Sequence, residues 1–170
     1  MKKYLVIVIV CFLTFNLNSQ IKNEIYEAED YNIKYPVDWV INSTLVNGVS
    51  FAVTSPLSSK DDEFSENVNI IIQDLKGMNI DLNKYVSISK QQLLSIPKGE
   101  ILESKRVKKK DVEYHSIVFN GYLEKRNLKI KQYYILKSGK AYVLTFTAIE
   151  KEYDLYIKIA DKILNSFKLK

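Results

Sequence analysis

Apolar residues recur with two different periods along this chain, and the two periods predict both strands and helices. Between residues 101 and 148 they alternate with polar residues, in segments rich in Val, Ile, Tyr, Phe and Thr, which is the pattern of β-strands. Turn-forming pairs separate these segments at Lys110-Asp111, Lys125-Arg126 and Ser138-Gly139. The pattern predicts an antiparallel meander of four strands, over 101–108, 112–123, 127–137 and 140–148.

Shorter strands are predicted before the meander. Two alternating stretches are separated by Glu29-Asp30, and Pro36 ends the second because proline cannot donate a hydrogen bond to a strand ladder. Asn47-Gly48 predicts a hairpin turn, since both residues tolerate positive φ. The run Ile70-Ile71-Ile72 indicates a strand that is buried on both faces. These signals place strands within 25–35, over 49–53 and over 68–75.

One segment between these two groups of strands has the helical period instead. Asp81 is a good helix cap, because its carboxylate can accept a hydrogen bond from a free backbone N–H of the first turn. Apolar residues then recur three and four positions apart over 82–96, until Pro97 and Gly99 stop the pattern. We therefore expect one amphipathic helix between the early strands and the meander.

A second apolar stripe, over 153–167, predicts a C-terminal helix that packs on the sheet. Thr147 and Glu150 have the spacing of a capping box at its start, and the alternative is that Thr147 still belongs to the preceding strand. A sheet with apolar positions on both faces needs a covering layer on each face. The order of the elements therefore predicts one α+β domain over 20–170, with a central antiparallel sheet of about six or seven strands between helices, in an α/β/α sandwich.

The first residues have the pattern of a secretory signal peptide. Lys2 and Lys3 precede an apolar run over 4–15, polar residues follow it, and Ser19 is a small residue at the expected cut. A run of this length is short for a membrane span, which needs about 20 apolar residues. We expect a signal peptide over 1–19 and an exported protein, periplasmic or secreted. Two alternatives are an uncleaved leader that tethers the protein to the membrane and a lipid on Cys11.

Removal of that leader changes the charge and the available chemistry. The whole chain has 170 residues and a net charge of +5, and the loss of 19 residues with two lysines leaves 151 residues and +3. The only cysteine lies in the leader, so the remaining chain can form no disulfide and no thiolate metal site. The small charge excess argues against a nucleic-acid partner. No cofactor, metal ligand or catalytic residue is predicted.

Four short motifs occur in this order along the chain: Tyr31 to Trp39 (YNIKYPVDW), Asn67 to Ile70 (NVNI), Ala141 to Ala148 (AYVLTFTA) and Asn165 to Phe167 (NSF). In this order and spacing they resemble the PsbP-like superfamily, which is named for an extrinsic protein of photosystem II and also contains the Ran-binding Mog protein. The resemblance implies a central antiparallel sheet between helices. Members are photosystem factors, a GTPase partner and exported bacterial proteins, so the resemblance implies no single activity.

Two runs of basic residues flank consecutive turns of the meander. If both runs approach one rim of the sheet, they form a patch for an anionic lipid, a glycan or an acidic protein. The plainer interpretation is a set of solvated charges that keep sheet edges from pairing with other chains. The candidate patch comprises Lys105, Arg106, Lys108, Lys109, Lys110, Lys125, Arg126, Lys129 and Lys131.

For the other candidate residues, a structural role explains the pattern better than a functional role does. His115 lies in an alternating segment without a second histidine or a nucleophile motif, so we expect a satisfied or exposed strand residue rather than a general base or a metal ligand. Trp39, in Tyr35-Pro36-x-x-Trp39, is expected in the core rather than in a binding lip. The carboxylates of 61–66 lack the ligand spacing of a calcium loop, and we expect a solvated acidic loop. They are Asp61, Asp62, Glu63 and Glu66.

These observations predict an exported, non-catalytic binding or accessory protein whose partner is an unknown protein or an anionic envelope component. Membrane contact is expected only if the leader is retained or lipidated. The alternative is a protein that binds a small ligand or a divalent cation in a pocket between the sheet and a helix. A third class is an enzyme whose active site uses only Asp, Glu, Tyr, Ser or Lys.

Overall fold

The computed structural model describes residues 22–44, 48–110 and 112–170. The expected signal peptide, with Ser19 and Cys11, lies outside the described residues, as do Asn47 of the expected hairpin turn and Asp111 of the first meander turn. Gly48, the second residue of that hairpin turn, has φ of 78°, the conformation for which a glycine is suited. Within the described residues no helix is long and apolar enough to cross a membrane.

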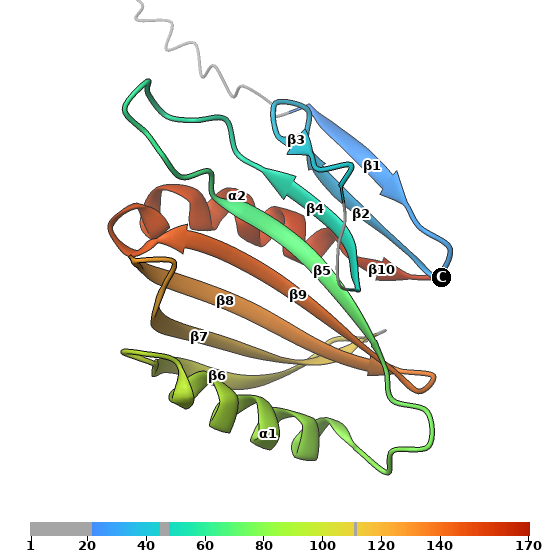
Figure 1. The fold of residues 1–170 in the computed structure, drawn as a ribbon. Coiled ribbons are helices and arrows are strands. Elements are labelled where there is room, and N and C mark those ends of the chain that lie inside the picture. Colours follow the sequence, from blue (N-terminus) through green and yellow to red (C-terminus); the bar gives the residue numbers. More distant parts are fainter. Residues whose placement is uncertain (1–21, 45–47, 111) are drawn as a thin grey trace, which may run out of the picture.

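A seven-stranded antiparallel sheet forms the centre of the molecule, in the order β3-β4-β5-β9-β8-β7-β6 (Figure 1). The expected meander is confirmed, because β6, β7, β8 and β9 pair consecutively along the sheet. Strand β9 then pairs with β5, which joins the meander to the early strands. The strands are β3 (Val40–Ile41), β4 (Val49–Thr54), β5 (Asn67–Asp74), β6 (Glu100–Lys108), β7 (Glu113–Leu123), β8 (Arg126–Lys137) and β9 (Lys140–Ile149).

A separate three-stranded sheet lies over one face of the central sheet. Strand β2 (Tyr31–Pro36) pairs with β1 (Asn23–Glu27) on one side and with β10 (Lys168–Leu169) on the other. The two strands expected within 25–35 are therefore present, and they belong to this small sheet rather than to the central one. Strand β10 was not predicted, because two residues are too few to show a period.

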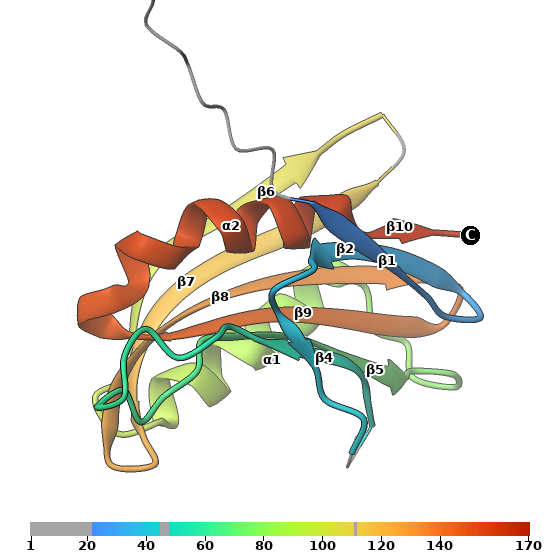
Figure 2. The same cartoon turned by 90° about the horizontal axis from the view of Figure 1, so that it is seen from above.

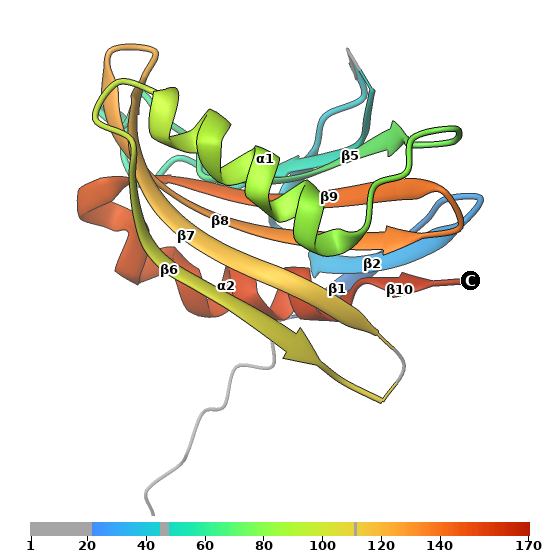
Figure 3. The same ribbon diagram turned by 90° about the horizontal axis from the view of Figure 1, so that it is seen from below.

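The two helices cover opposite faces of the central sheet. Helix α2 (Tyr153–Ser166) and the small sheet lie over one face, and helix α1 (Leu82–Ser95) lies under the other (Figures 1 to 3). The predicted cap of α1 is confirmed, because the Asp81 carboxylate accepts a hydrogen bond of 2.7 Å from the backbone N–H of Lys84. These layers confirm the α+β sandwich.

No capping box forms at the start of α2, and the alternative that Thr147 belongs to the preceding strand is confirmed. Thr147 is still part of β9, where it lies opposite Asn67 on one side and Ile130 on the other. A short 3-10 helix (Glu150–Glu152) follows, and α2 begins only at Tyr153, with no side-chain hydrogen bond at its cap. Pairing on both sides of β9 keeps Thr147 in the sheet, and this overrides the local capping signal.

The core divides into two apolar clusters, one on each face of the sheet. The cluster under α2 and the small sheet is rich in aromatic residues, including Tyr31, Phe51 and Phe146, which are at most 1% exposed. The cluster above α1 is mostly aliphatic. Trp39 belongs to the first cluster, so its expected place in the core is confirmed. The expected burial of the isoleucine run is also confirmed, since Ile70 and Ile72 contact the first cluster and Ile71 the second.

Candidate functional site

The two predicted basic runs lie at opposite ends of the central sheet. Lys108, Lys109 and Lys110 lie at the β6–β7 turn, whereas Lys125 and Arg126 lie at the β7–β8 turn. Strand β7 joins the two turns with 11 residues. At about 3.4 Å per residue, the turns are roughly 35 Å apart. The expectation that both runs approach one rim is therefore wrong, because antiparallel pairing places consecutive turns at opposite ends.

Several members of the predicted patch take part in packing or in ion pairs. The Lys129 ammonium lies 4.4 Å from the centre of the Tyr153 ring. Lys131 forms an ion pair with Asp161 of α2, and only 14% of its side chain is exposed. These two lysines therefore hold α2 against the sheet. Lys105 pairs with Glu103, at 3.7 Å, on the edge strand β6. Arg126 pairs with Glu63, also at 3.7 Å, and its guanidinium lies 5.8 Å from the centre of the Phe64 ring.

The remaining members contribute to a larger set of cations at the β6–β7 turn, which we call the basic end. Residues distant in the sequence join them there, from the β8–β9 turn, the turn after β5 and the C-terminal strand (Figures 1 and 3). Sequence reasoning missed these additional lysines, since only the topology brings their segments together. The basic end comprises Arg106, Lys108, Lys109, Lys110, Lys76, Lys137, Lys140, Lys168 and Lys170.

Carboxylates hold some of these cations in place. The Asp30 carboxylate accepts hydrogen bonds from the Lys140 ammonium, at 2.6 Å, and from the Tyr142 hydroxyl, at 3.0 Å. These two bonds lower the pKa of Asp30. Glu113 accepts a hydrogen bond of 2.9 Å from the Arg106 guanidinium, and this bond is the largest cause of a lowered pKa at Glu113. Both carboxylates are therefore charged at neutral pH. Asp30 fixes Lys140, whereas Glu113 pairs with Arg106 and, at 3.4 Å, with Lys108.

Five exposed lysines of the basic end form no ion pair within the part of the chain that the structure describes: Lys76, Lys109, Lys110, Lys137 and Lys168. The Lys109 ammonium donates a hydrogen bond of 2.9 Å to the Asn165 side chain, and Lys137 and Lys168 point their charges to solvent. An anion that binds them need not break a native ion pair. These five lysines are therefore the members best able to hold an external negative charge.

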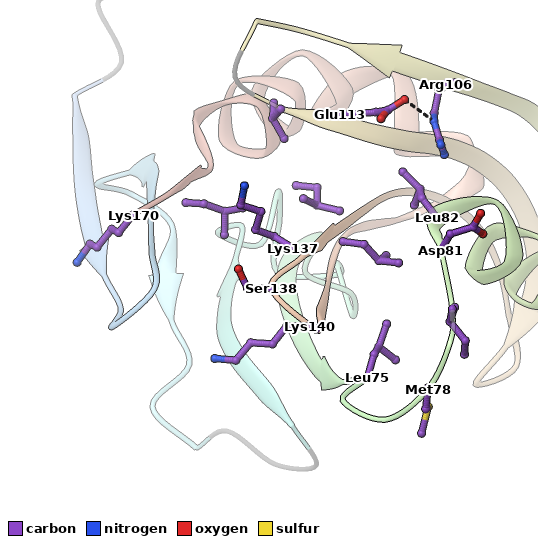
Figure 4. Close-up of a pocket in the computed structure, with 16 residues that line it drawn as sticks. Leu75, Met78, Asp81, Leu82, Arg106, Glu113, Lys137, Ser138, Lys140 and Lys170 are labelled. Carbon is purple, nitrogen blue, oxygen red and sulfur yellow. Dashed lines mark hydrogen bonds and ion pairs between the residues drawn. The ribbon is translucent and has the colours of Figure 1, made fainter.

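The basic end is hollowed rather than flat. A groove of about 750 Å³ lies between the start of α1, the β6–β7 hairpin, the β8–β9 turn and the C-terminus (Figure 4). Lys137, Lys140 and Lys170 line it, together with the paired Arg106 and Glu113. A smaller hollow of about 430 Å³ adjoins the groove, between the sheet and the C-terminal part of α2. The expected pocket between the sheet and a helix is therefore present.

His115 is a satisfied strand residue, as expected. It lies on β7, and its ring Nε2 forms a hydrogen bond of 2.7 Å with the Ser104 hydroxyl of β6. Partial burial lowers its pKa first, and the nearby charges of Lys90 and Arg106 add to this effect. The imidazole is therefore neutral at pH 7, with one nitrogen engaged in the sheet.

The acidic loop differs from the expectation at one residue. Asp62 is solvated at the surface and organises the loop, since its carboxylate accepts hydrogen bonds from the backbone N–H groups of Ser58 and Phe64. Glu66 is instead fully buried. Its Oε2 accepts a hydrogen bond of 3.3 Å from the Ser55 hydroxyl, whereas its Oε1 has no partner among the described residues. Burial is the largest cause of the raised pKa of Glu66.

The residues that the structure describes contain no cluster of side chains that could bind a metal ion. No group of three or more His, Cys, Asp or Glu side chains lies close enough there to hold an ion. The carboxylates of the acidic loop do not converge on a common point, and Glu66 faces the core. The chemistry that the basic end offers is therefore the binding of negative charge, by ammonium groups around two adjoining hollows.

No protein-family model and no curated protein matches the chain by sequence. The fold itself has close counterparts among solved structures. Cyanobacterial PsbP (CyanoP) from Synechocystis sp. PCC 6803 superposes with a TM-score of 0.63 at 15% identity, over 88% of this chain and 94% of that protein. The chain has the PsbP-like fold. This confirms the fold that the sequence motifs indicate.

Two further structures show how widely the PsbP-like fold is used. LpqN, involved in cell envelope biogenesis of Mycobacterium tuberculosis, superposes with a TM-score of 0.62 at 13% identity, over 89% of this chain and 92% of that protein. The Ran-binding protein Mog1p of Saccharomyces cerevisiae gives a TM-score of 0.59 at 11% identity, over 88% of this chain and 96% of that protein. At such identities the likeness concerns the fold, and function has to be argued from the surface of this chain.

Proposed function

We propose that this protein is an exported, non-catalytic accessory protein whose basic end binds an anionic component of the cell envelope. One observation carries the proposal: cations from three separate segments line a groove of about 750 Å³, and five of the lysines at this end have no ion-pair partner among the described residues. The signal-peptide pattern at the N-terminus supports an envelope location. LpqN, which has the same fold, is involved in cell envelope biogenesis.

The binding energy of such a surface comes from several modest contributions. Each lysine close to an anionic membrane surface contributes about 1 kcal/mol. Lys109, Lys137 and Lys168 together therefore favour binding by about 3 kcal/mol, which corresponds to more than a hundredfold in affinity. Such contributions decrease with salt, since the Debye length shortens to about 8 Å at physiological ionic strength. A reversible, salt-sensitive contact is the expected behaviour.

Vesicle binding tests this proposal. The protein of residues 20–170 is mixed with vesicles of phosphatidylcholine alone or with vesicles that also contain about 30% phosphatidylglycerol, which gives a surface potential of tens of millivolts. The bound fraction is measured by sedimentation. We expect binding only to the anionic vesicles. The triple variant Lys109→Glu, Lys137→Glu, Lys168→Glu should weaken this binding by at least about tenfold.

A matched triple variant changes the net charge equally at other exposed sites: Lys60→Glu, Lys125→Glu, Lys158→Glu. We expect this control to retain most of the binding. Equal losses in the two triple variants would show that net charge rather than the basic end controls binding. Binding to soluble polyglutamate without binding to vesicles would assign the basic end to an acidic protein partner instead.

A further inference from the structure

The smaller hollow of the basic end differs from the groove in its chemistry. Its floor consists of Tyr114 and Tyr133 of the central sheet, and Leu164 and Phe167 at the end of α2 form a wall. The two tyrosine rings lie 4.4 Å apart between their centres and are tilted by 35°. An aromatic and aliphatic surface of this kind favours the apolar part of a ligand, because burial of apolar area is favourable.

The rim of the hollow is positively charged. The Lys109 ammonium lies 5.5 Å from the centre of the Tyr114 ring, and Lys168 extends from the C-terminal strand. None of the ten described residues that line the hollow is an aspartate or a glutamate. The C-terminal end of α2 contributes only about half a negative charge, against two full positive charges. The net field at the rim therefore attracts an anion.

Polar groups of the hollow are fixed by the protein before any ligand binds. The Lys109 ammonium donates to the Asn165 side chain, which places that charge at the edge of the hollow. The Tyr133 hydroxyl interacts with Tyr114 and Asn165, and burial raises its pKa, so the phenol stays neutral. A ligand therefore meets a neutral aromatic floor and a charge at one side only.

The size of the hollow indicates a small molecule rather than a polymer. Its volume of about 430 Å³ lies near the lower limit of ordinary ligand pockets, which run from about 300 to 1,000 Å³. Val112, Ile135 and Leu169 line both the hollow and the adjoining groove. A flexible chain that exceeds the hollow therefore finds further apolar surface next to it.

We propose that this hollow binds a small organic anion with an apolar body, a carboxylate or phosphate on a single hydrocarbon chain. The chain lies on Tyr114 and Tyr133, and the negative charge lies between Lys109 and Lys168. This site is additional to the proposed function, because its ligand is a small molecule within the hollow rather than an envelope surface. Two residues, Lys109 and Lys168, serve both.

Titration calorimetry with decanoate as the probe tests the site on residues 20–170. We expect decanoate to bind at least tenfold more tightly than acetate, which has the charge without the chain. It should also bind at least tenfold more tightly than decyltrimethylammonium, which has the chain with the opposite charge. The double variant Lys109→Met, Lys168→Met keeps the apolar stems and should weaken decanoate binding about tenfold, whereas Lys125→Met, Lys158→Met should change it less than twofold.

A third variant separates this site from the proposed function. Asn165 is exposed in the last turn of α2, so Asn165→Trp fills the mouth of the hollow. It removes the acceptor of the Lys109 ammonium but leaves every charge of the basic end at the surface, where a vesicle can still contact it. We expect loss of decanoate binding with retained binding to anionic vesicles. Absence of decanoate binding to the wild type, equal binding of the cationic analogue, or unchanged binding by Asn165→Trp would each overturn the proposed site.

Discussion

The two ends of the central sheet are built from the same strands, but cations predominate at one end and carboxylates at the other. At the basic end, lysines from three segments surround two hollows. At the other end, which we call the acidic end, the loop before β5 meets the β7–β8 turn and the start of α2. Figure 3 shows the two ends at opposite sides of the molecule. The carboxylates of the acidic end are Asp61, Asp62, Glu63, Glu66, Glu124, Glu150, Glu152 and Asp154.

The direction of α2 explains part of this difference. Its N-terminus lies at the acidic end and its C-terminus at the basic end. The backbone dipoles of a helix favour negative side chains near its N-terminus and positive side chains near its C-terminus, by about 0.3–1 kcal/mol each. Glu152 and Asp154 follow this preference at one end, and Lys109 and Lys168 at the other. A net charge of +5 for the whole chain therefore describes neither end.

The largest effect on stability is expected at Lys131, a lysine of the predicted patch that pairs α2 with the sheet. Lys131→Met removes the ion pair with Asp161 of α2, and we expect it to lower the free energy of unfolding by about 2 kcal/mol, because the partner carboxylate is left half-buried. Denaturation with urea measures this loss.

Lys137 provides the matched comparison, six residues further along the same strand. Lys137→Met should change the free energy of unfolding by less than about 0.5 kcal/mol, since the side chain is exposed. It should instead reduce the binding of anionic vesicles. Equal stability losses in the two variants would contradict the division between structural and binding lysines.

Glu66, the buried carboxyl group of the acidic end, should make the free energy of unfolding depend on pH. Because the pKa of Glu66 is raised in the folded protein, the folded state binds its proton more tightly than the unfolded state does. Stability from this group is therefore fully present below the unfolded pKa of about 4.3 and is lost as pH rises through the folded pKa. Glu66→Gln should remove this loss and raise the free energy of unfolding at pH 7 by about 1 kcal/mol.

Urea denaturation from pH 4 to pH 8 measures this prediction. The difference between Glu66→Gln and the wild type should grow with pH over that window. Glu63→Gln is the control, because the side chain of Glu63 is 86% exposed at the same end. A difference that stays constant across the range would show that Glu66 does not titrate there.

The smallest effect concerns the cap of α1, which lies at the basic end. Asp81→Ala removes the hydrogen bond to the Lys84 N–H and should lower the free energy of unfolding by about 0.5–1 kcal/mol. It also removes a negative charge from the lining of the groove, so the binding of anionic vesicles should become slightly tighter.

Asp81→Asn separates these two effects, because asparagine caps a helix about as well as aspartate does. We expect stability close to that of the wild type together with the tighter vesicle binding. Weaker vesicle binding by both variants would contradict the assignment of the groove to anions.

Regular periods in the sequence predicted most elements of the fold. The meander and helix α1 follow from strong local signals, and α1 ends at Ser95, one residue before the predicted limit. The start of α2 was not predictable in this way, because pairing of β9 with two neighbours keeps Thr147 in the sheet. Strand β10 was not predictable either, because it is stabilised by its pairing with β2 rather than by a pattern in its own sequence.

The candidate site was predictable only in part. Lys108 to Lys110 were identified from their density along the chain, whereas Lys137, Lys140 and Lys168 join them through long-range topology. Burial of Glu66 has the same origin, since it depends on how the loop folds against the rest of the domain. Local sequence records which side chains are charged, and the sheet order decides which of them meet.

The pairing of β10 with β2 has a consequence for the order of folding. The last strand of the chain completes a sheet that the first strands begin, and nearby Ser166 accepts a hydrogen bond from the Lys34 N–H across 132 residues of sequence. Contacts of such separation form late, because a long loop must close first. A chain that emerges from its N-terminus therefore cannot complete this layer until its last residues are free.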